Sequence, residues 1–188
     1  RKPDSGAVLR RSSTTALVRR STSSSIRQTM RNTINLNRWF DSFHLVDGAI
    51  STELFRSGCP VSVAPEQWAL NHLKVLTQLH RAYLGAGAEA LTAATFGANL
   101  FNPLAEFDED TLAEALQILV GTAREAAGDD ILVAASVGPL ALFSSSDPAS
   151  GELRAHYRKH LKILSTTDCD IIAFETFTSL SEAEIALE

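Results

Sequence analysis

The chain has 188 residues, 45% of them hydrophobic, and a formal net charge of −5. This length can enclose one ordinary globular core, and the acidic balance argues against nucleic acid as a main partner. No apolar stretch approaches the roughly 20 residues that cross a bilayer, so no membrane partner is expected. The two cysteines, Cys59 and Cys169, lie 110 positions apart without metal-ligand spacing, which indicates structural thiols in a reducing compartment.

Residues 1–40 differ in composition from the rest of the chain. They carry nine Arg or Lys and twelve Ser or Thr against one acid, Asp4, so their net charge is +8 and that of the remainder is −13. Because so little apolar surface is available to offset the entropy of ordering, we expect a disordered extension. Its composition fits a basic tail, sequence upstream of a start at Met30, or a mitochondrial transit peptide. We therefore expect a cytoplasmic protein, or a mitochondrial one if this segment is a transit peptide.

From residue 43 onward, short apolar runs alternate with longer segments of helical period, which is typical of βα units on a parallel sheet. The expected strands are 43–46, 90–95, 132–136 and 170–174, and the expected helices are 66–86, 110–127, 152–165 and 181–188. Glycines close the first two helices, and Ser181 is the expected N-cap of the last. The chain lacks an initial Met and stops within that helix, so we expect a fragment.

Each expected strand is followed by, or ends in, a polar side chain or a glycine. The candidates are Asp47, Gly48, Ala49, Thr95, Ser136 and Glu175. Because the carboxyl ends of parallel strands meet at one edge of a sheet, these residues should come within reach of one ligand. Purely structural roles remain open for each of them, as turn formers, strand residues or ion-pair partners. His80 and Tyr83, on the inner stripe of helix 66–86, are expected to pack rather than to act chemically.

Five motifs occur in order between residues 47 and 176. They read Asp47-Gly48-Ala49-Ile50-Ser51-Thr52-Glu53-Leu54, His80-Arg81-Ala82-Tyr83-Leu84-Gly85-Ala86-Gly87-Ala88, Thr92-Ala93-Ala94-Thr95-Phe96-Gly97-Ala98-Asn99, Ser136-Val137-Gly138-Pro139-Leu140-Ala141 and Phe174-Glu175-Thr176. With these motifs, residues 43–188 resemble the zinc-dependent homocysteine S-methyltransferases. The Ser-Val-Gly-Pro turn is more similar to the branch that uses S-methylmethionine or S-adenosylmethionine than to the betaine branch.

The resemblance implies an α/β fold, a (β/α)8 TIM barrel of which residues 41–188 hold the first four βα units. It implies methyl transfer from a sulfonium donor, S-methylmethionine or S-adenosylmethionine, to homocysteine, giving methionine. The family's zinc is held by cysteines of Gly-x-Asn-Cys and Gly-Gly-Cys-Cys segments, and neither occurs in this sequence. We therefore expect no catalytic or metal-ligating residue here, zinc only in the full-length protein, and an inactive fragment when this chain stands alone.

Homocysteine carries an ammonium and a carboxylate, and the resemblance places both near the strand ends. Asp47 and Glu175 are the expected partners of the ammonium, while backbone amides at Gly48-Ala49 and in the turn that begins at Ser136 are expected to receive the carboxylate. Thr95 completes the predicted set. The expected partners are thus homocysteine and a sulfonium methyl donor, with neither nucleic acid nor membrane.

Two other functions are considered. The first is a non-catalytic truncated barrel that acts as a binding or assembly protein, since an open half-barrel exposes strand edges and apolar sheet surface. The second is an unrelated barrel lyase or aldolase. The sequence argues against a Schiff-base enzyme of this kind, because no expected strand ends in a Lys. A coding sequence that continues into the two cysteine segments would favour the methyltransferase, whereas a genuine stop after Glu188 would favour the non-catalytic protein.

Overall fold

The computed structural model describes residues 15–19, 34–144 and 148–188. In chain order the elements are β1 (Thr15–Arg19), α1 (Leu36–Phe40), α2 (Ile50–Arg56), α3 (Pro65–Leu70), α4 (Leu73–Gly85), β2 (Ala90–Ala93), α5 (Glu109–Ala127), β3 (Leu132–Val137), the 3₁₀ helix η1 (Leu140–Phe143), α6 (Ser150–Leu164), β4 (Ile171–Glu175) and α7 (Leu180–Leu187). Within the described ranges, no helix combines the length and apolar character needed to cross a membrane.

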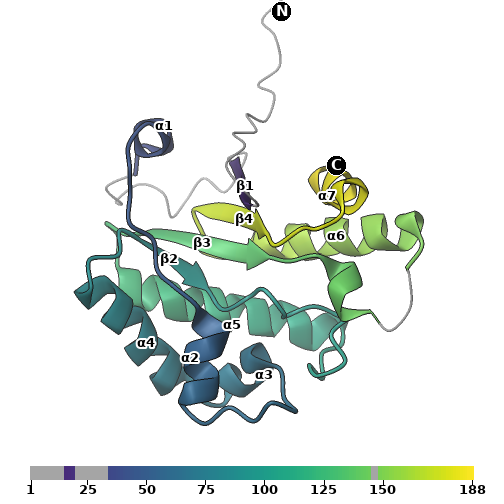
Figure 1. The fold of residues 1–188 in the computed structure, drawn as a ribbon, viewed down its shortest axis with the longest axis horizontal. Helices are drawn as coiled ribbons and strands as arrows, with labels where there is room; N and C mark the ends of the chain where they lie inside the picture. Colours follow the sequence, from purple (N-terminus) through teal and green to yellow (C-terminus); the bar gives the residue numbers. More distant parts are fainter. Residues whose placement is uncertain (1–14, 20–33, 145–147) are drawn as a thin grey trace, which may run out of the picture.

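Four strands form one sheet in the order β1-β4-β3-β2. β2, β3 and β4 run parallel, with Ala90 opposite Leu132 and Ala134 opposite Ile171, whereas β1 pairs antiparallel with β4. Helices α2 to α5 lie on one side of the sheet and α1 lies on the other (Figure 1). This parallel arrangement, with helical crossovers between successive strands, is the α/β architecture that the alternating sequence pattern predicts.

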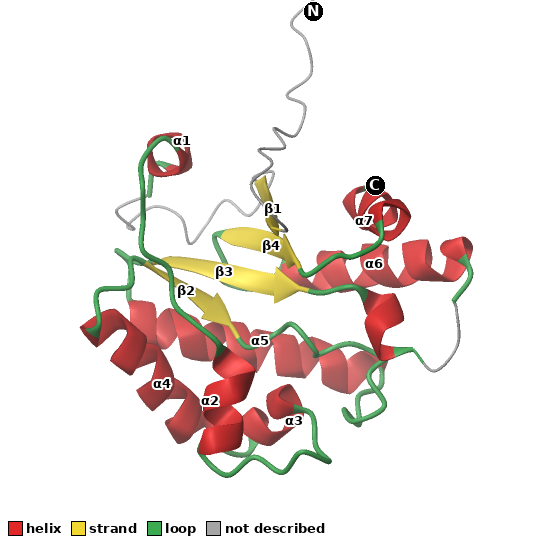
Figure 2. Ribbon diagram, in the orientation of Figure 1, coloured by secondary structure: helices red, strands yellow, loops and turns green. Residues whose placement is uncertain are grey.

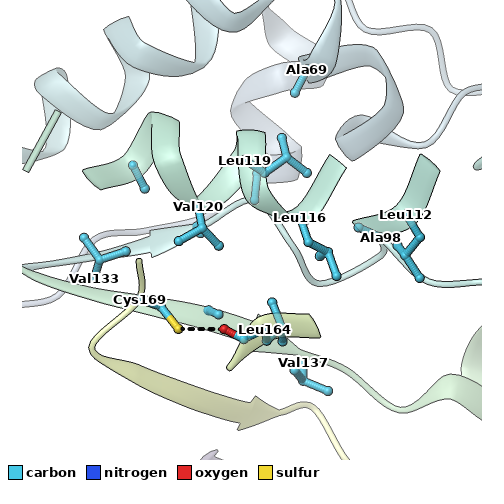
Figure 3. Close-up of a cluster of buried hydrophobic side chains, with 14 of the residues drawn as sticks. Ala69, Ala98, Leu112, Leu116, Leu119, Val120, Val133, Val137, Leu164 and Cys169 are labelled. Carbon is cyan, nitrogen blue, oxygen red and sulfur yellow. Dashed lines mark hydrogen bonds between the residues drawn. The ribbon is translucent and has the colours of Figure 1, made fainter. Parts of the chain in front are cut away.

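Alternation along the strands divides the sheet into two faces. One face packs on the helices, where Leu116 and Val120 of α5 point toward the strand that carries Val133 and Val137, while Leu119 points toward Ala69 of α3 (Figure 3). The opposite face, here called the inner face, consists of small and aliphatic side chains: Ala90, Leu132, Ala134, Ile171 and Ala173. The large core therefore lies between sheet and helices, and the inner face is left for other elements to cover.

The single helix expected over 66–86 is wrong, because the chain forms two helices, α3 and α4, separated at Asn71 and His72. His72 has φ −134° and ψ 39°, outside the helical region. Its Nδ1 lies 2.8 Å from the carbonyl oxygen of Trp68, and its ring stacks on the Trp68 ring at 3.8 Å between centroids. Asn71 Nδ2 also donates a hydrogen bond to the Gln67 carbonyl oxygen, at 3.5 Å. Side-chain bonds to the backbone thus compete with the helix at this point.

The first expected strand is reduced to one bridge, between Val46 and Ala90. Two backbone bonds hold it beside β2, from Glu89 N to Leu45 O and from Asp47 N to Ala90 O. Phe43 is 93% exposed. Among the described residues no strand pairs with the other side of this segment, and an unpaired edge explains its lack of regular strand structure.

Boundaries elsewhere shift by a few residues. β2 ends at Ala93, before Thr95, and β4 extends to include Glu175. The last helix begins at Leu180 with Ser179 as its N-cap, whose Oγ accepts from Glu182 N at 3.3 Å, so the assignment of Ser181 as N-cap is wrong. Ser179 precedes the first helical residue and leaves its oxygen free to accept, which is the geometry that an N-cap requires.

Two segments of the 1–40 extension have regular structure, which differs from the expectation of disorder. β1 uses the free edge of β4, with Thr15 opposite Glu175 and Arg19 opposite Ile171. α1 packs its apolar side chains on the inner face. Edge pairing and apolar contact supply stabilisation that composition alone does not reveal. The remaining positions of that expectation, 1–14 and 20–33, lie outside the described residues.

Candidate functional site

A cavity of about 490 Å³ opens at the carboxyl ends of β2, β3 and β4. The loops that follow β2 and β3 leave from this edge of the sheet (Figure 2). Its polar lining includes Asp47 of the first loop, Glu66 of α3, and Thr92, Ser136 and Glu175 of the three parallel strands. Of the six predicted site residues, Asp47, Gly48, Ala49, Ser136 and Glu175 line it. The strand ends therefore converge as the sequence predicts.

Asp47 is held rigidly by Thr92 of β2. Its Oδ2 accepts from Thr92 N at 2.7 Å, and its Oδ1 accepts from Thr92 Oγ1 at 2.8 Å. Burial raises the pKa of Asp47 to about 6; the bonds from Thr92 oppose this rise, and the charge of Glu175 adds to it. Within the described ranges, no Lys, Arg or His side chain lines the cavity beside Asp47, so this carboxylate favours a cationic ligand.

Glu175 is fixed from the neighbouring strand. The buried Ser136 donates its Oγ hydrogen to Glu175 Oε1. The next residue, Thr176, also lines the cavity and has φ 65°, in the left-handed region that is uncommon for a β-branched residue. Such strain persists where the surrounding structure enforces it, and it concentrates at binding sites.

Thr95 does not line the cavity, although the sequence predicts it as a site residue. It lies beyond the end of β2 and is fully buried. Its Oγ1 donates to the carbonyl oxygen of Ser136 at 2.8 Å. Thr95 thus ties the end of β2 to the end of β3, and its contact with the cavity runs through Ser136.

Thr92 and Glu66 are two polar lining residues that the sequence analysis did not predict. Thr92 faces the cavity because it alternates with Leu91 and Ala93, and strand period was a usable signal for it. Glu66 is a buried carboxylate on α3 whose Oε1 accepts from Gly97 N at 2.9 Å, and burial raises its pKa. A Cβ added at Gly97 would lie 2.8 Å from Glu66 Oε2, so an alanine here would displace the Glu66 carboxylate.

The two side chains expected to pack do so. His80 is fully buried, and burial lowers its pKa to about 4, which keeps it neutral. Neither of its ring nitrogens has a hydrogen-bond partner among the described residues, which differs from the satisfied hydrogen bond expected with its packing. Tyr83 donates its hydroxyl hydrogen to the Ala49 carbonyl oxygen at 3.1 Å and packs against Gly48, where an added Cβ would lie 3.0 Å from the hydroxyl oxygen. Tyr83 thereby holds the loop that follows Asp47.

The described residues do not provide a zinc site. No group of three or more His, Cys, Asp or Glu side chains in the described ranges has metal-binding geometry. Both cysteines are buried and neither lines the cavity. Cys59 Sγ lies 3.6 Å from the Pro60 carbonyl oxygen, and Cys169 Sγ lies 3.7 Å from that of Leu164 (Figure 3). Both thiols therefore act as packing groups.

Comparison with known proteins now fixes the family. A sequence profile described as "Homocysteine S-methyltransferase" matches residues 44–188, which is most of the chain and nearly all of the cavity lining. The chain belongs to the homocysteine S-methyltransferase family. This confirms the resemblance drawn from the five motifs.

Similar proteins agree with this assignment. Homocysteine S-methyltransferase YbgG of Bacillus subtilis is 27% identical over 169 residues, covering 77% of this chain and 54% of that protein. Homocysteine S-methyltransferase 4 of Zea mays is 29% identical over 173 residues, covering 77% of this chain and 50% of that protein. The metallated crystal structure of the homocysteine methyltransferase MmuM from Escherichia coli superposes with a TM-score of 0.66 at 25% identity, covering 80% of this chain and 60% of that one. The chain spans about half the length of the relatives it matches.

The stability of this family member should depend on pH through Asp47. Because its pKa is about 6 in the folded chain against 3.8 ordinarily, the folded state keeps a proton that the unfolded state releases between these values. The free energy of unfolding therefore falls as pH rises from about 4 to about 6, because Asp47 must ionise in the folded chain at a cost. We expect Asp47→Asn to gain stability over wild type across this window, by up to about 3 kcal/mol. Urea unfolding of both proteins at pH 4 and pH 7 measures it, and a difference that does not change with pH would contradict it.

Proposed function

We propose that this chain forms the amino-acid-binding half of a homocysteine S-methyltransferase. The reaction would transfer a methyl group from S-methylmethionine or S-adenosylmethionine to the homocysteine sulfur, giving methionine. One observation carries the proposal: two carboxylates, Asp47 of the first loop and Glu175 of β4, line one cavity, and each is fixed by a hydroxyl donor. Family membership supplies the reaction class.

The ammonium of homocysteine would lie between these carboxylates. Thr92 donates to both oxygens of Asp47 and Ser136 donates to one oxygen of Glu175, which holds both groups in place, so little ordering is needed when the ligand arrives. Charge-assisted hydrogen bonds of this kind contribute roughly 1.5–3 kcal/mol each. The ligand carboxylate would meet backbone amides of the loop at Gly48 and Ala49, which lines the same cavity. Asp47 and Glu175 thus orient the substrate, and neither is assigned a catalytic role.

Zinc is expected in the full-length protein, where it would deprotonate the homocysteine thiol and so supply the nucleophile. The cysteine thiols of this chain line no part of the cavity, and its described residues include no metal-binding group. No step is therefore assigned through a metal to residues of this chain. We propose a complete (β/α)8 barrel in which this chain supplies the first four βα units, and we expect the chain by itself to be inactive and to bind no stoichiometric zinc.

A non-catalytic binding or assembly role is the second proposal. It is favoured by the edge at residues 43–46, where Phe43 is 93% exposed and Leu45 and Val46 are about half exposed. Such an edge can pair with another chain. Metal analysis and a methyl-transfer assay on the full-length protein separate the two proposals: zinc with turnover supports the enzyme, and a correctly folded protein with neither supports the binding role.

Charge-neutral substitutions test the ammonium site directly. Asp47→Asn and Glu175→Gln should each raise the Kd for homocysteine roughly 10- to 100-fold, because each removes one charged acceptor of the ammonium. Glu114→Gln, on the exposed side of α5, is the matched control and should leave the Kd unchanged. Isothermal titration calorimetry at pH 7.5 provides the measurement. Affinities equal to wild type in both site variants would remove these residues from the site.

A further inference from the structure

The inner face of the sheet is covered by the segment that contains α1. Ile34, Leu36, Trp39 and Phe40 pack on the apolar cluster of that face. Within the helix, Leu36, Trp39 and Phe40 follow the i, i+3, i+4 spacing that places side chains on one side, and Asn37 and Arg38 between them are exposed. Asn35 caps the helix by accepting from Arg38 N at 3.3 Å. This five-residue helix is therefore amphipathic, and its apolar side faces the sheet.

Two contacts fasten α1 to the edge of the sheet. The Trp39 ring stacks on the His44 ring, with 4.2 Å between centroids and 4° between planes. His44 Nδ1 in turn lies 2.6 Å from Glu89 Oε2, and Glu89 directly precedes β2. Contacts between side chains thus connect the helix to the residue that precedes β2.

The position of α1 along the strands defines its relation to the site. The cluster on which the helix segment packs includes the first residues of β2, β3 and β4, which are Ala90, Leu132 and Ile171, together with Ala134 and Ala173. The polar site residues lie at the opposite, carboxyl ends of these strands. Trp39 lines the same cavity as Asp47 and Glu175. The cavity therefore extends from the polar edge down the inner face until it meets the helix.

We infer that α1 is a plug that closes the inner face of the sheet and that Trp39 forms the floor of the substrate cavity. The family profile matches residues 44–188, and Trp39 lies before this range. The floor of the cavity therefore comes from a segment that the profile does not match. An aromatic floor limits the depth of the cavity and keeps water from entering through the inner face. The role of Trp39 toward a ligand rests on the proposed function; the plug itself does not.

Removal of the plug has a defined physical consequence. Without α1, the apolar cluster of the inner face loses the cover that Ile34, Leu36, Trp39 and Phe40 give it in this chain, and exposed apolar patches bind dyes and other apolar surfaces. Leu36→Ser combined with Phe40→Ser removes two of the three apolar anchors while it keeps Trp39 as a reporter. Trp68→Phe in the same chain leaves Trp39 as the single tryptophan, because the sequence holds two.

Fluorescence of Trp39 in the Trp68→Phe protein tests the plug. We expect weak quenching by acrylamide, and at least twofold stronger quenching with increased binding of anilinonaphthalene sulfonate after Leu36→Ser/Phe40→Ser, with the far-ultraviolet circular dichroism retained. Val61→Ser, at an apolar side chain that is 84% exposed and away from α1, should change neither signal. If Trp39 in the Trp68→Phe protein is quenched as strongly as free tryptophan, or if the double variant changes nothing, the plug is excluded.

Titration with homocysteine tests the role of Trp39 as the cavity floor separately from the proposed function. Binding seen by calorimetry together with a change in Trp39 emission, and a changed Kd in Trp39→Ala, supports both. Binding without either change excludes Trp39 as the floor and leaves the proposed function standing. Absence of binding contradicts the proposed function and leaves the quenching result, and thus the plug, intact.

Discussion

Arg124→Met should destabilise this protein by about 3–5 kcal/mol, the loss typical of breaking a buried ion pair from one side. The Arg124 guanidinium is nearly buried on α5 and pairs with Asp170, at the start of β4. It also donates to the carbonyl oxygens of Gly128, Ile131 and Asp168 at 2.9–3.2 Å. Asp170 accepts in addition from Val133 N at 2.8 Å, so one side chain ties the starts of β3 and β4 to a helix.

Urea unfolding followed by circular dichroism measures this effect. Arg56→Met is the matched control, because Arg56 pairs with Glu53 on the surface and its side chain is 71% exposed. Exposed pairs contribute about 1 kcal/mol or less. Arg124→Met/Asp170→Asn should lose less stability than Arg124→Met alone, since the uncompensated carboxylate is then neutral. Equal small losses in Arg124→Met and Arg56→Met would show that the buried network is not a main source of stability.

Gly138→Ala should destabilise by about 1–3 kcal/mol and disturb the cavity wall. A Cβ at this position would lie 2.5 Å from Cε2 of Phe96, closer than real contacts allow, and Phe96 lines the cavity. The Phe96 ring or the turn after β3 must therefore move. Ser136 lies two residues before this turn, so homocysteine affinity should fall together with stability.

Gly121→Ala is the control, and it should change the stability of the protein in the opposite direction. Gly121 lies within α5, and an added Cβ would meet nothing within 4 Å. Alanine is the better helix former by up to about 1 kcal/mol, so this variant should be more stable than wild type. Thermal unfolding of both variants gives the comparison. Two shifts of the same sign would mean that backbone entropy, and not contact with Phe96, determines the result at Gly138.

The sequence predicts the parallel part of the fold well, because strand and helix periods are local signals. β2, β3 and β4 and the long helices α5 and α6 appear within a few residues of their expected bounds. The convergence of Asp47, Ser136 and Glu175 on one cavity also follows, since parallel strands place their carboxyl ends at one edge. These features depend on patterns that tertiary contacts reinforce.

Other features depend on contacts that a single sequence does not display. The break between α3 and α4 follows from the stacking of His72 on Trp68, and α1 orders because the inner face offers it an apolar surface. Glu66 reaches the cavity only through the path of α3 and its bond to Gly97. Thr95 does not line the cavity, and its hydroxyl instead donates to the carbonyl oxygen of Ser136.

The central claim is that the cavity recognises the ammonium of homocysteine through paired carboxylates. Calorimetric titration at pH 7.5 with homocysteine and with 4-mercaptobutanoate, which lacks only the amino group, tests it most directly. We predict that homocysteine binds at least tenfold more tightly than this analogue and that Asp47→Asn/Glu175→Gln abolishes the difference. Equal affinities of the wild-type protein for the two compounds would contradict the claim.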